Sequence, residues 1–161
     1  MCELYKPLED MLNKINIPLT TKTSNRRGFP KHRKATFGMV RERFSGKINI
    51  SRFSRIYPDI YEEILRIGKI ICPFEFTSIH INKNVVCPPH KDDKNVGDSL
   101  IVSIGDYQGC KLVVDGVVCD AHYNPIIFNG ALLEHSNTDD LVGTKYSLVY
   151  YNMNTGGKSK N

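Results

Sequence analysis

Three side chains in the second half of the sequence have the types and the spacing of a metal site. His90 and Asp92 stand two residues apart, and His135 follows further along the chain. On an extended strand, residues i and i+2 point to the same side, so His90 and Asp92 can bind one face of an ion while His135 comes from a neighbouring strand. Two imidazoles and one carboxylate, with the remaining coordination positions open, form the facial triad typical of non-heme Fe(II) oxygenases. The sequence therefore predicts an iron centre for oxidation by O2, with His90, Asp92 and His135 as its catalytic metal ligands.

A cation and a hydroxyl follow the third predicted ligand. Lys145 and Ser147 lie in the alternating run 144–151, so we expect both side chains on one face of a strand. Together they could bind the carboxylate of a co-substrate. His-x-Asp alone arises often by chance, and its combination with the second histidine and the Lys-x-Ser pair carries the prediction. The other histidines belong to no such arrangement and are assigned surface or structural roles: His32, His80 and His122.

The composition indicates one soluble domain in a reducing compartment. The 161 residues suffice for one hydrophobic core and are too few for two domains. The sequence shows no signal-peptide pattern and no apolar run of membrane-spanning length. Its five cysteines are odd in number and lack CxxC spacing, which argues against a disulfide framework or a zinc ribbon. We therefore expect a soluble intracellular protein, in the cytoplasm or the nucleus, with no membrane partner.

Positive charge is concentrated in residues 21–55. The chain has a net charge of +5, whereas this segment carries eleven Lys and Arg residues against a single acid, Glu42. Phenylalanines are interleaved with the cations, among them Phe29, Phe37 and Phe44. This combination suits contact with phosphates and stacking on bases, although a solvated surface arm would have the same composition. We expect a nucleic-acid contact, with Arg33 and Lys34 binding the substrate and Phe29 or Phe37 either stacking on a base or lying in the core.

Hydrophobic periodicity predicts helices followed by short strands. Helices are expected over 5–16 and over 58–67, the second ended by Gly68. Strands are expected over 36–40, 47–50, 74–82, 99–104, 111–114, 117–119, 125–128 and 145–152. This order predicts an α+β, mainly β fold, with a double-sheet jelly-roll core and the N-terminal helices packed outside. We expect one domain over 1–153, divided into a helical and basic part at 1–70 and the core at 71–153, and a disordered tail at 154–161.

Residues 75–153 resemble the Fe(II)/2-oxoglutarate-dependent dioxygenases, which have a double-stranded β-helix core. His-x-Asp, a later His and a Lys or Arg ten residues beyond it are shared by much of that superfamily, and this chain has all of them. Within the superfamily, the segments 81–84, 89–92, 95–99, 105–109 and 146–151 look most like the TET/JBP group, which oxidises the 5-methyl group of pyrimidines in nucleic acid. The chain lacks the large insertions of animal members and in this respect is similar to a small viral or microbial relative.

The resemblance implies that Fe(II), 2-oxoglutarate and O2 take part in the reaction. Lys145 and Ser147 match the pair that binds 2-oxoglutarate, with Lys where the TET/JBP group normally has Arg, and Asn82 joins them. Gly109-Cys110 replaces a Gly-Gly pair expected in that group. The implied reaction hydroxylates a C–H bond and converts 2-oxoglutarate to succinate and CO2.

The resemblance also implies which residues read the base. Asn95, five residues beyond the first iron-binding His, matches an Asn or Asp that hydrogen-bonds the flipped base. The base-contacting His of the group corresponds here to Met153, a departure for which the amide of the neighbouring Asn152 could substitute. The implied substrate is 5-methylcytosine or thymine in nucleic acid, with DNA favoured over RNA.

Three other functions remain open. A protein hydroxylase of the prolyl 4-hydroxylase type is supported by Lys145 and by the approach to it over 139–143. An AlkB-like repair demethylase is disfavoured because that group's paired arginines near the C-terminus are absent. A noncatalytic jelly roll that binds nucleic acid or metal is disfavoured because the ligand set and the anion-binding pair are both intact.

Overall fold

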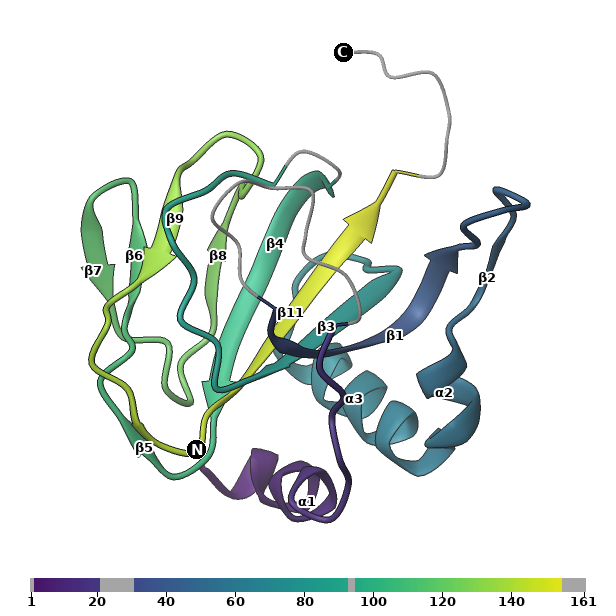
Figure 1. Ribbon diagram of the computed structural model, residues 1–161, viewed down its shortest axis with the longest axis horizontal. Helices are drawn as coiled ribbons and strands as arrows, with labels where there is room; N and C mark the ends of the chain where they lie inside the picture. Colours follow the sequence, from purple (N-terminus) through teal and green to yellow (C-terminus); the bar gives the residue numbers. More distant parts are fainter. Residues whose placement is uncertain (1, 21–30, 93–94, 155–161) are drawn as a thin grey trace.

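Antiparallel β-strands form the centre of the computed structural model, which describes residues 2–20, 31–92 and 95–154 (Figure 1). The larger sheet has six strands in the order β2-β1-β3-β11-β4-β8. Its strands are β1 (Arg33–Arg41), β2 (Ile48–Ile50), β3 (Ser78–Lys83), β4 (Asn95–Ile104), β8 (Ile126–Phe128) and β11 (Tyr146–Met153). A second sheet has the order β7-β6-β9, and β10 pairs with β5. These strands are β5 (Tyr107–Gln108), β6 (Leu112–Val114), β7 (Val117–Cys119), β9 (His135–Asn137) and β10 (Val142–Gly143).

Helices pack against one face of the larger sheet (Figure 1). They are α1 (Cys2–Leu12), α2 (Arg52–Ile56) and α3 (Pro58–Ile71). Alternate residues of β3, β4 and β11 point toward them and are fully buried, as the period of two along a strand requires: Ile79, Ile81, Leu100, Val102, Leu148 and Tyr150. These side chains form the main core together with apolar residues of α1 and α3. No helix within the described ranges is long and apolar enough to span a membrane.

The opposite face of the larger sheet is turned toward the three-stranded sheet. Ile101 and Phe128 of the larger sheet pack there in a second apolar cluster with Leu112 and Val114 of β6. Two antiparallel sheets with an apolar cluster between them, and helices outside the larger one, form the predicted arrangement. The expectation of a mainly β jelly roll with N-terminal helices packed outside is therefore confirmed.

About a third of the basic segment belongs to the larger sheet. The strands expected at 36–40 and 47–50 are confirmed as β1 and β2, and β1 pairs with β3 between Arg33↔Lys83 and Gly38↔Ser78. Phe37 is fully buried and packs against the rings of Phe53 and Tyr61, so it has the core role. Phe29 lies outside the described residues, as does the predicted disordered tail from residue 155 onward.

The observed elements differ from the predicted ones mainly at their ends. Helix α1 begins earlier than the predicted 5–16. It also ends earlier, because Lys14 and Ile15 donate backbone hydrogen bonds to carbonyls only three residues back. Strand β3 begins later than predicted and β4 begins earlier. The short elements α2, β5 and β10 were not predicted, since two to five residues show no clear periodicity. Strand β9 contains His135, for which a strand was expected without bounds. Asp115 and Gly116 do form the expected two-residue turn between β6 and β7, with φ of 50° and 79°.

Gly68 does not end α3, so that prediction is wrong. The helix continues to Ile71, and Gly68 is instead the point where it comes closest to the sheet. A Cβ at this position would lie 2.6 Å from Phe76 Cζ and 2.7 Å from Tyr150 Cε2. Tyr150 is held in place because its hydroxyl donates a 2.7 Å hydrogen bond to the Ile64 carbonyl. The glycine therefore serves helix–sheet packing.

Replacing Gly68 with alanine tests this close approach. We expect Gly68→Ala to lower the free energy of unfolding by about 1–3 kcal/mol through overpacking, although alanine is the better helix former by about 1 kcal/mol. Urea unfolding followed by circular dichroism measures the change. Lys69→Ala, at the exposed next position, is the matched control and should change stability by less than about 0.5 kcal/mol. A Gly68→Ala protein as stable as the original would contradict the packing argument.

Candidate metal centre

Backbone pairing brings the two predicted histidine ligands together. His90 and His135 form an antiparallel bridge, with the His90 N–H donating to the His135 carbonyl at 3.0 Å and the reverse bond at 2.9 Å. Asp92, two residues on, donates its N–H to the Gly130 carbonyl at 2.8 Å. All three predicted ligands thus lie on one short stretch of backbone pairing between residues 90–92 and 130–135.

Each histidine ring is oriented by a carbonyl of its own chain segment. His90 Nδ1 lies 2.8 Å from the Pro88 carbonyl, and His135 Nδ1 lies 2.9 Å from the Leu133 carbonyl. A carbonyl can only accept, so each Nδ1 carries the proton and each Nε2 presents a lone pair. Both Nε2 atoms face the Asp92 carboxylate, at 3.6 Å for His90 and 3.3 Å for His135. The second ring nitrogen of a metal-binding histidine is typically held in this way.

The grouping fits a divalent metal ion. The ligand atoms of His90, Asp92 and His135 all lie within 4.8 Å of one another. Both Nε2 atoms and the Asp92 carboxylate face one another, so one ion between them could be bound by all three groups. Nitrogen and carboxylate ligands in a set of two to one suit non-heme Fe(II). His135 is buried with the Phe128 ring edge-on at 4.9 Å, whereas a quarter of the Asp92 side chain is exposed, so the centre opens toward Asp92.

Gly130 lies against the Asp92 carboxylate, a contact that the sequence did not reveal. A Cβ on Gly130 would lie 2.6 Å from Asp92 Oδ2 and 3.2 Å from His135 Cε1. No side chain therefore fits here without displacing a predicted ligand. This requirement comes from a contact between distant residues and has no local sequence signal.

A row of polar side chains crosses the sheet face opposite the helices. Asn82 of β3 pairs with Lys34 of β1 and with Ser147 of β11, and Ser147 pairs with Ser103 of β4. The Ser103 and Ser147 hydroxyl oxygens are 3.5 Å apart. The structure thus brings the predicted residues Lys34, Asn82 and Ser147 together and adds Ser103, which sequence analysis missed.

Lys145 is a buried cation immediately before β11. Its side chain is 2% exposed, and Nζ donates to the Cys110 carbonyl at 2.9 Å and lies 3.2 Å from Cys110 Sγ. The ring of Tyr107 lies beneath the ammonium at 5.5 Å, and a hydrogen bond joins the side chains of Tyr107 and Ser103. Among the described residues, no carboxylate lies within 4.0 Å of Nζ. A buried charge is costly without a counter-charge, so this place favours an anionic ligand.

The backbone conformation of Cys110 bears on the replacement of a Gly-Gly pair by Gly109-Cys110. Its φ is +50°, a left-handed conformation that favours glycine, so a Gly-Gly pair is the ordinary solution here. With Cys110, this position also supplies a thiol beside the Lys145 ammonium. Burial raises the pKa of the nearby Tyr107 to about 12, so its hydroxyl remains neutral at physiological pH.

The structure separates two predicted substrate residues from this group. Arg33 points to the opposite face of β1 from Lys34, and its guanidinium donates to the Ile17 carbonyl at 2.8 Å, so it is not brought to the polar row. The Asn152 amide donates to the Glu75 carbonyl at 2.6 Å and is therefore already engaged.

Asn95 lies at the first position of β4, paired in register with Met153. It adjoins residues 93–94, which are outside the described ranges. The two positions at which the resemblance locates base recognition are therefore neighbours across two strands.

His80 is a further histidine on the site-facing side of the sheet. Its Nδ1 lies 3.0 Å from Thr36 Oγ1, and its ring stacks on Tyr151 at 4.7 Å between centroids. Burial, with a smaller contribution from Lys34, lowers the pKa of His80 to about 3, so the ring is neutral at physiological pH. These contacts agree with the structural role expected for it.

Adding one methyl group at Gly130 tests the geometry of the centre. We expect Gly130→Ala to weaken Fe(II) binding at least about tenfold, because the Cβ would push the Asp92 carboxylate away. Anaerobic titration calorimetry with Fe(II) measures the dissociation constant. Leu132→Ala, an exposed change in the same turn, is the control and should leave it unchanged. Equal affinities for the two variants would show that Asp92 does not bind the ion.

Comparison with known proteins gives a likeness of fold. No protein-family model and no curated protein matches the sequence. Among solved structures the chain is similar to NgTET1 in complex with 5mC DNA, with a TM-score of 0.62 and 12% identity, over 95% of this chain and 68% of that one. It is also similar to a 2OG-Fe(II) oxygenase family protein from Burkholderia pseudomallei, with a TM-score of 0.56 and 16% identity, over 91% of this chain and 76% of that one.

A prolyl-4-hydroxylase from Pseudomonas putida is similar as well, with a TM-score of 0.54 and 12% identity, over 96% of this chain and 88% of that one. At such low identities the likeness concerns the backbone. This chain has the fold of the 2OG-Fe(II) oxygenase superfamily.

Proposed function

We propose that this protein is an Fe(II)- and 2-oxoglutarate-dependent dioxygenase that hydroxylates a C–H bond. One observation carries the proposal: both histidine rings are tethered through Nδ1, so that their Nε2 lone pairs and the Asp92 carboxylate meet at one point. Three preorganised ligands leave the other positions of an octahedral ion for substrates. The ion and 2-oxoglutarate, when bound, supply the activation of O2 and the oxidation of the C–H bond.

The buried end of the site would bind the co-substrate. Lys145 would hold the distal carboxylate of 2-oxoglutarate by a charge-assisted hydrogen bond, since its ammonium lies near no protein carboxylate in the described residues. Ser147 and Asn82 are paired in register on the neighbouring strands and would supply further polar contacts. Tyr107 and Ser103 are neutral neighbours that complete this end without adding a competing negative charge.

The protein would also exclude water from the buried side of the ion. Phe128 covers the His135 ring, and it belongs to the apolar cluster with Leu112, Val114 and Ala121 between the two sheets. Because these side chains are packed behind the ligands, the target must approach from the side of Asp92 and His90, which are partly exposed. Exclusion of water and a fixed approach are what the protein contributes to a cofactor-borne reaction.

For the substrate, we propose the 5-methyl group of 5-methylcytosine or thymine in nucleic acid, with DNA favoured over RNA. The similar fold of NgTET1, solved in complex with 5mC DNA, supports this class. Lys34 adds positive charge to the site-facing side of the sheet, next to Asn82. A base in duplex would have to be flipped out at a cost of a few kcal/mol, and the Asn95 amide offers the paired donor and acceptor that a base edge requires.

A protein hydroxylase of the prolyl 4-hydroxylase type is the second candidate. The Pseudomonas putida prolyl-4-hydroxylase has a similar fold, and a lysine, Lys145, stands at the proposed 2-oxoglutarate position. The two candidates share every step at the iron centre and differ only in the target. Their products therefore distinguish them: oxidised nucleosides in one case and hydroxylated peptide in the other.

Turnover by the iron-loaded protein tests the proposed reaction and substrate together. With 2-oxoglutarate and 5-methylcytosine- or thymine-containing DNA, we expect succinate formation and a nucleoside that gains one oxygen. Asp92→Ala should lose both activities by at least about a hundredfold, because a ligand is removed. Asp98→Ala, an exposed carboxylate change six positions along, should retain them. Succinate analysis and mass spectrometry of digested nucleosides measure the outcome.

The possible results test the nucleic-acid substrate, the metal triad and the catalytic activity separately. Succinate without a changed nucleoside would remove the nucleic-acid substrate and keep the dioxygenase. Full activity in Asp92→Ala would contradict the triad. No succinate with any substrate, in a protein that binds iron, would favour a noncatalytic binding module.

The role of Lys145 has its own test. We expect Lys145→Met, which keeps the length of the side chain and removes its charge, to raise KM for 2-oxoglutarate at least about tenfold, the loss of one charge-assisted hydrogen bond. The rate at saturating 2-oxoglutarate should fall much less. Lys111→Met removes an exposed charge and serves as the control. An unchanged KM in Lys145→Met would show that 2-oxoglutarate does not meet this ammonium.

A further inference from the structure

The turn that joins β1 to β2 presents a fully exposed aromatic side chain among cations. Phe44 is 97% exposed, more than any other large hydrophobic residue in the described part of the chain. The guanidinium of Arg43 lies over its ring, with Cζ 5.8 Å from the ring centroid. The surrounding cations belong to the turn and to α2: Arg41, Arg43, Lys47, Arg52 and Arg55. We call residues 41–50 the basic hairpin.

The basic hairpin has a defined structure, so the exposure of Phe44 is a property of the fold. Glu42 and Lys47 are joined by a 2.7 Å backbone hydrogen bond, and the Gly46 N–H donates to the Glu42 carbonyl at 2.9 Å. Arg41 Nη1 donates to the Gly46 carbonyl at 2.8 Å, which closes the turn from the other side. These bonds fix the backbone on both sides of Phe44 and point its ring outward.

The single acid of the hairpin does not cancel its positive charge. The Glu42 carboxylate accepts hydrogen bonds from the Ser45 hydroxyl at 2.6 Å and the Asn49 amide at 2.7 Å, and these neutral donors lower the pKa of Glu42. Its negative charge is thus directed back into the hairpin. The cations Arg43, Lys47 and Arg52 make no ion pair with a carboxylate in the described residues.

A nucleic-acid strand is the partner that this combination fits. Guanidinium and ammonium groups bind phosphates, and an aromatic ring accepts the face of any base. An acidic protein would satisfy the cations but would leave the ring without a planar partner. We propose that the basic hairpin is a nucleic-acid contact in which Phe44 stacks on a base while Arg43 and Lys47 bind the flanking phosphates.

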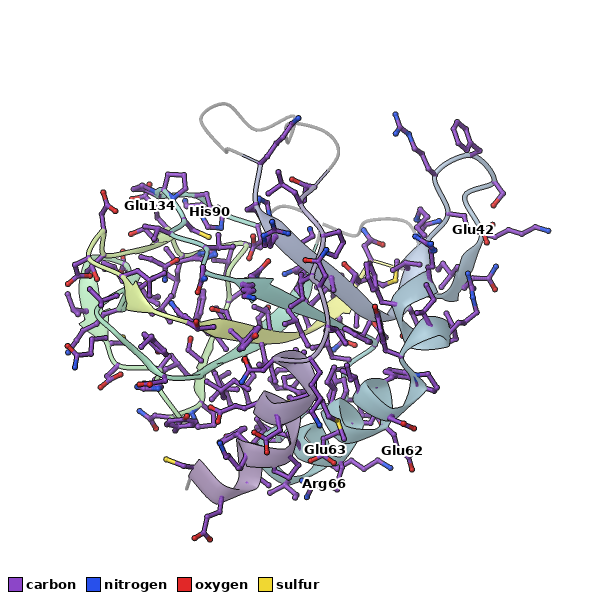
Figure 2. The ribbon with its side chains drawn as sticks, turned by 60° about the horizontal axis from the view of Figure 1, so that its bottom comes forward. Glu42, Glu62, Glu63, Arg66, His90 and Glu134 are labelled. Atoms are coloured by element: carbon purple, nitrogen blue, oxygen red, sulfur yellow. The ribbon has the colours of Figure 1, made fainter. Side chains whose placement is uncertain are left out.

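The distance along β1 separates this contact from the iron centre. Lys34, in the polar row, and Arg41, at the start of the hairpin, are joined by one strand, which at about 3.3 Å per residue spans about 23 Å. In the view of Figure 2, Glu42 of the hairpin and His90 of the centre lie toward opposite ends of the molecule. At about 3.4 Å per nucleotide, the length of β1 between Lys34 and Arg41 corresponds to about seven nucleotides, so we expect Phe44 to contact a base several positions from the one at the iron centre. It is an anchor for the strand and does not fill the gap left by a flipped base.

This inference uses the nucleic-acid substrate of the proposed function, but binding tests it without catalysis. Fluorescence anisotropy with a labelled 20-nucleotide single strand measures affinity, using protein without iron or 2-oxoglutarate. We expect Phe44→Ala to weaken binding at least about fivefold and Phe44→Trp to retain it, since stacking needs only an aromatic face. Ile70→Ala, an exposed apolar change on α3, is the control and should bind as the original protein does.

The salt dependence of binding identifies the phosphate contacts. Arg43→Ala should weaken binding and reduce the slope of log affinity against log salt by about one, whereas Phe44→Ala should leave that slope unchanged. If Phe44→Ala binds as tightly as the original protein, or if Phe44→Leu binds as well as Phe44→Trp, the stacking contact is wrong. Turnover of DNA with no effect of Phe44 would sustain the proposed function and reject this inference. Loss of binding in Phe44→Ala without turnover of any nucleic acid would sustain the stacking contact and reject the nucleic-acid substrate of the proposed function.

Discussion

The reciprocal backbone pairing of His90 and His135 is the interaction on which the site depends. These residues are far apart in the sequence, and two hydrogen bonds between their main chains bring their rings to within 4.2 Å of each other, centroid to centroid. Each ring is then turned by a carbonyl of its own segment, so no other side chain is needed to orient either of them. Asp92 is added by the next main-chain bond, to Gly130. The metal centre is therefore built mostly from backbone hydrogen bonds, which tolerate a wide range of surrounding side chains.

The two faces of the larger sheet have different roles: one packs against the helices and the other carries the polar row of the candidate site. Along β11, Leu148 and Tyr150 point toward the helices and belong to the core. Ser147 points to the other face, where it is paired with Asn82 in the polar row. The period of two along a strand allows one strand to serve both purposes. The helices stabilise one face, so the other face can carry a row of polar groups and a buried cation. On that other face the apolar cluster includes Ile101 of β4 and Phe128 of β8, whereas the polar row runs over β1, β3, β11 and β4.

The alternation of residues along strands and the types of the metal-binding side chains made the main features of the candidate site predictable from the sequence. The pairs His90–Asp92 and Lys145–Ser147 follow from the period of two along an extended strand, and the structure brings His90, Asp92 and His135 together. Predictions failed where a contact between distant residues decides. The helix end predicted at Gly68 is wrong because Phe76 and Tyr150 pack against this glycine inside α3. The contact between Gly130 and Asp92 was missed because it has no local sequence signal. Arg33 and Lys34 have the same charge and are neighbours, yet the pleat sends them to opposite faces.

The burial of Lys145 links occupancy of the site to the stability of the whole domain. An ammonium that is 2% exposed and lies near no carboxylate in the described residues raises the free energy of the folded, ligand-free protein. Any anion that enters beside it removes part of that cost, and mass action then favours the folded state in proportion to the logarithm of the anion concentration. In the proposed enzyme 2-oxoglutarate is such an anion, so the melting temperature would rise with the concentration of this co-substrate.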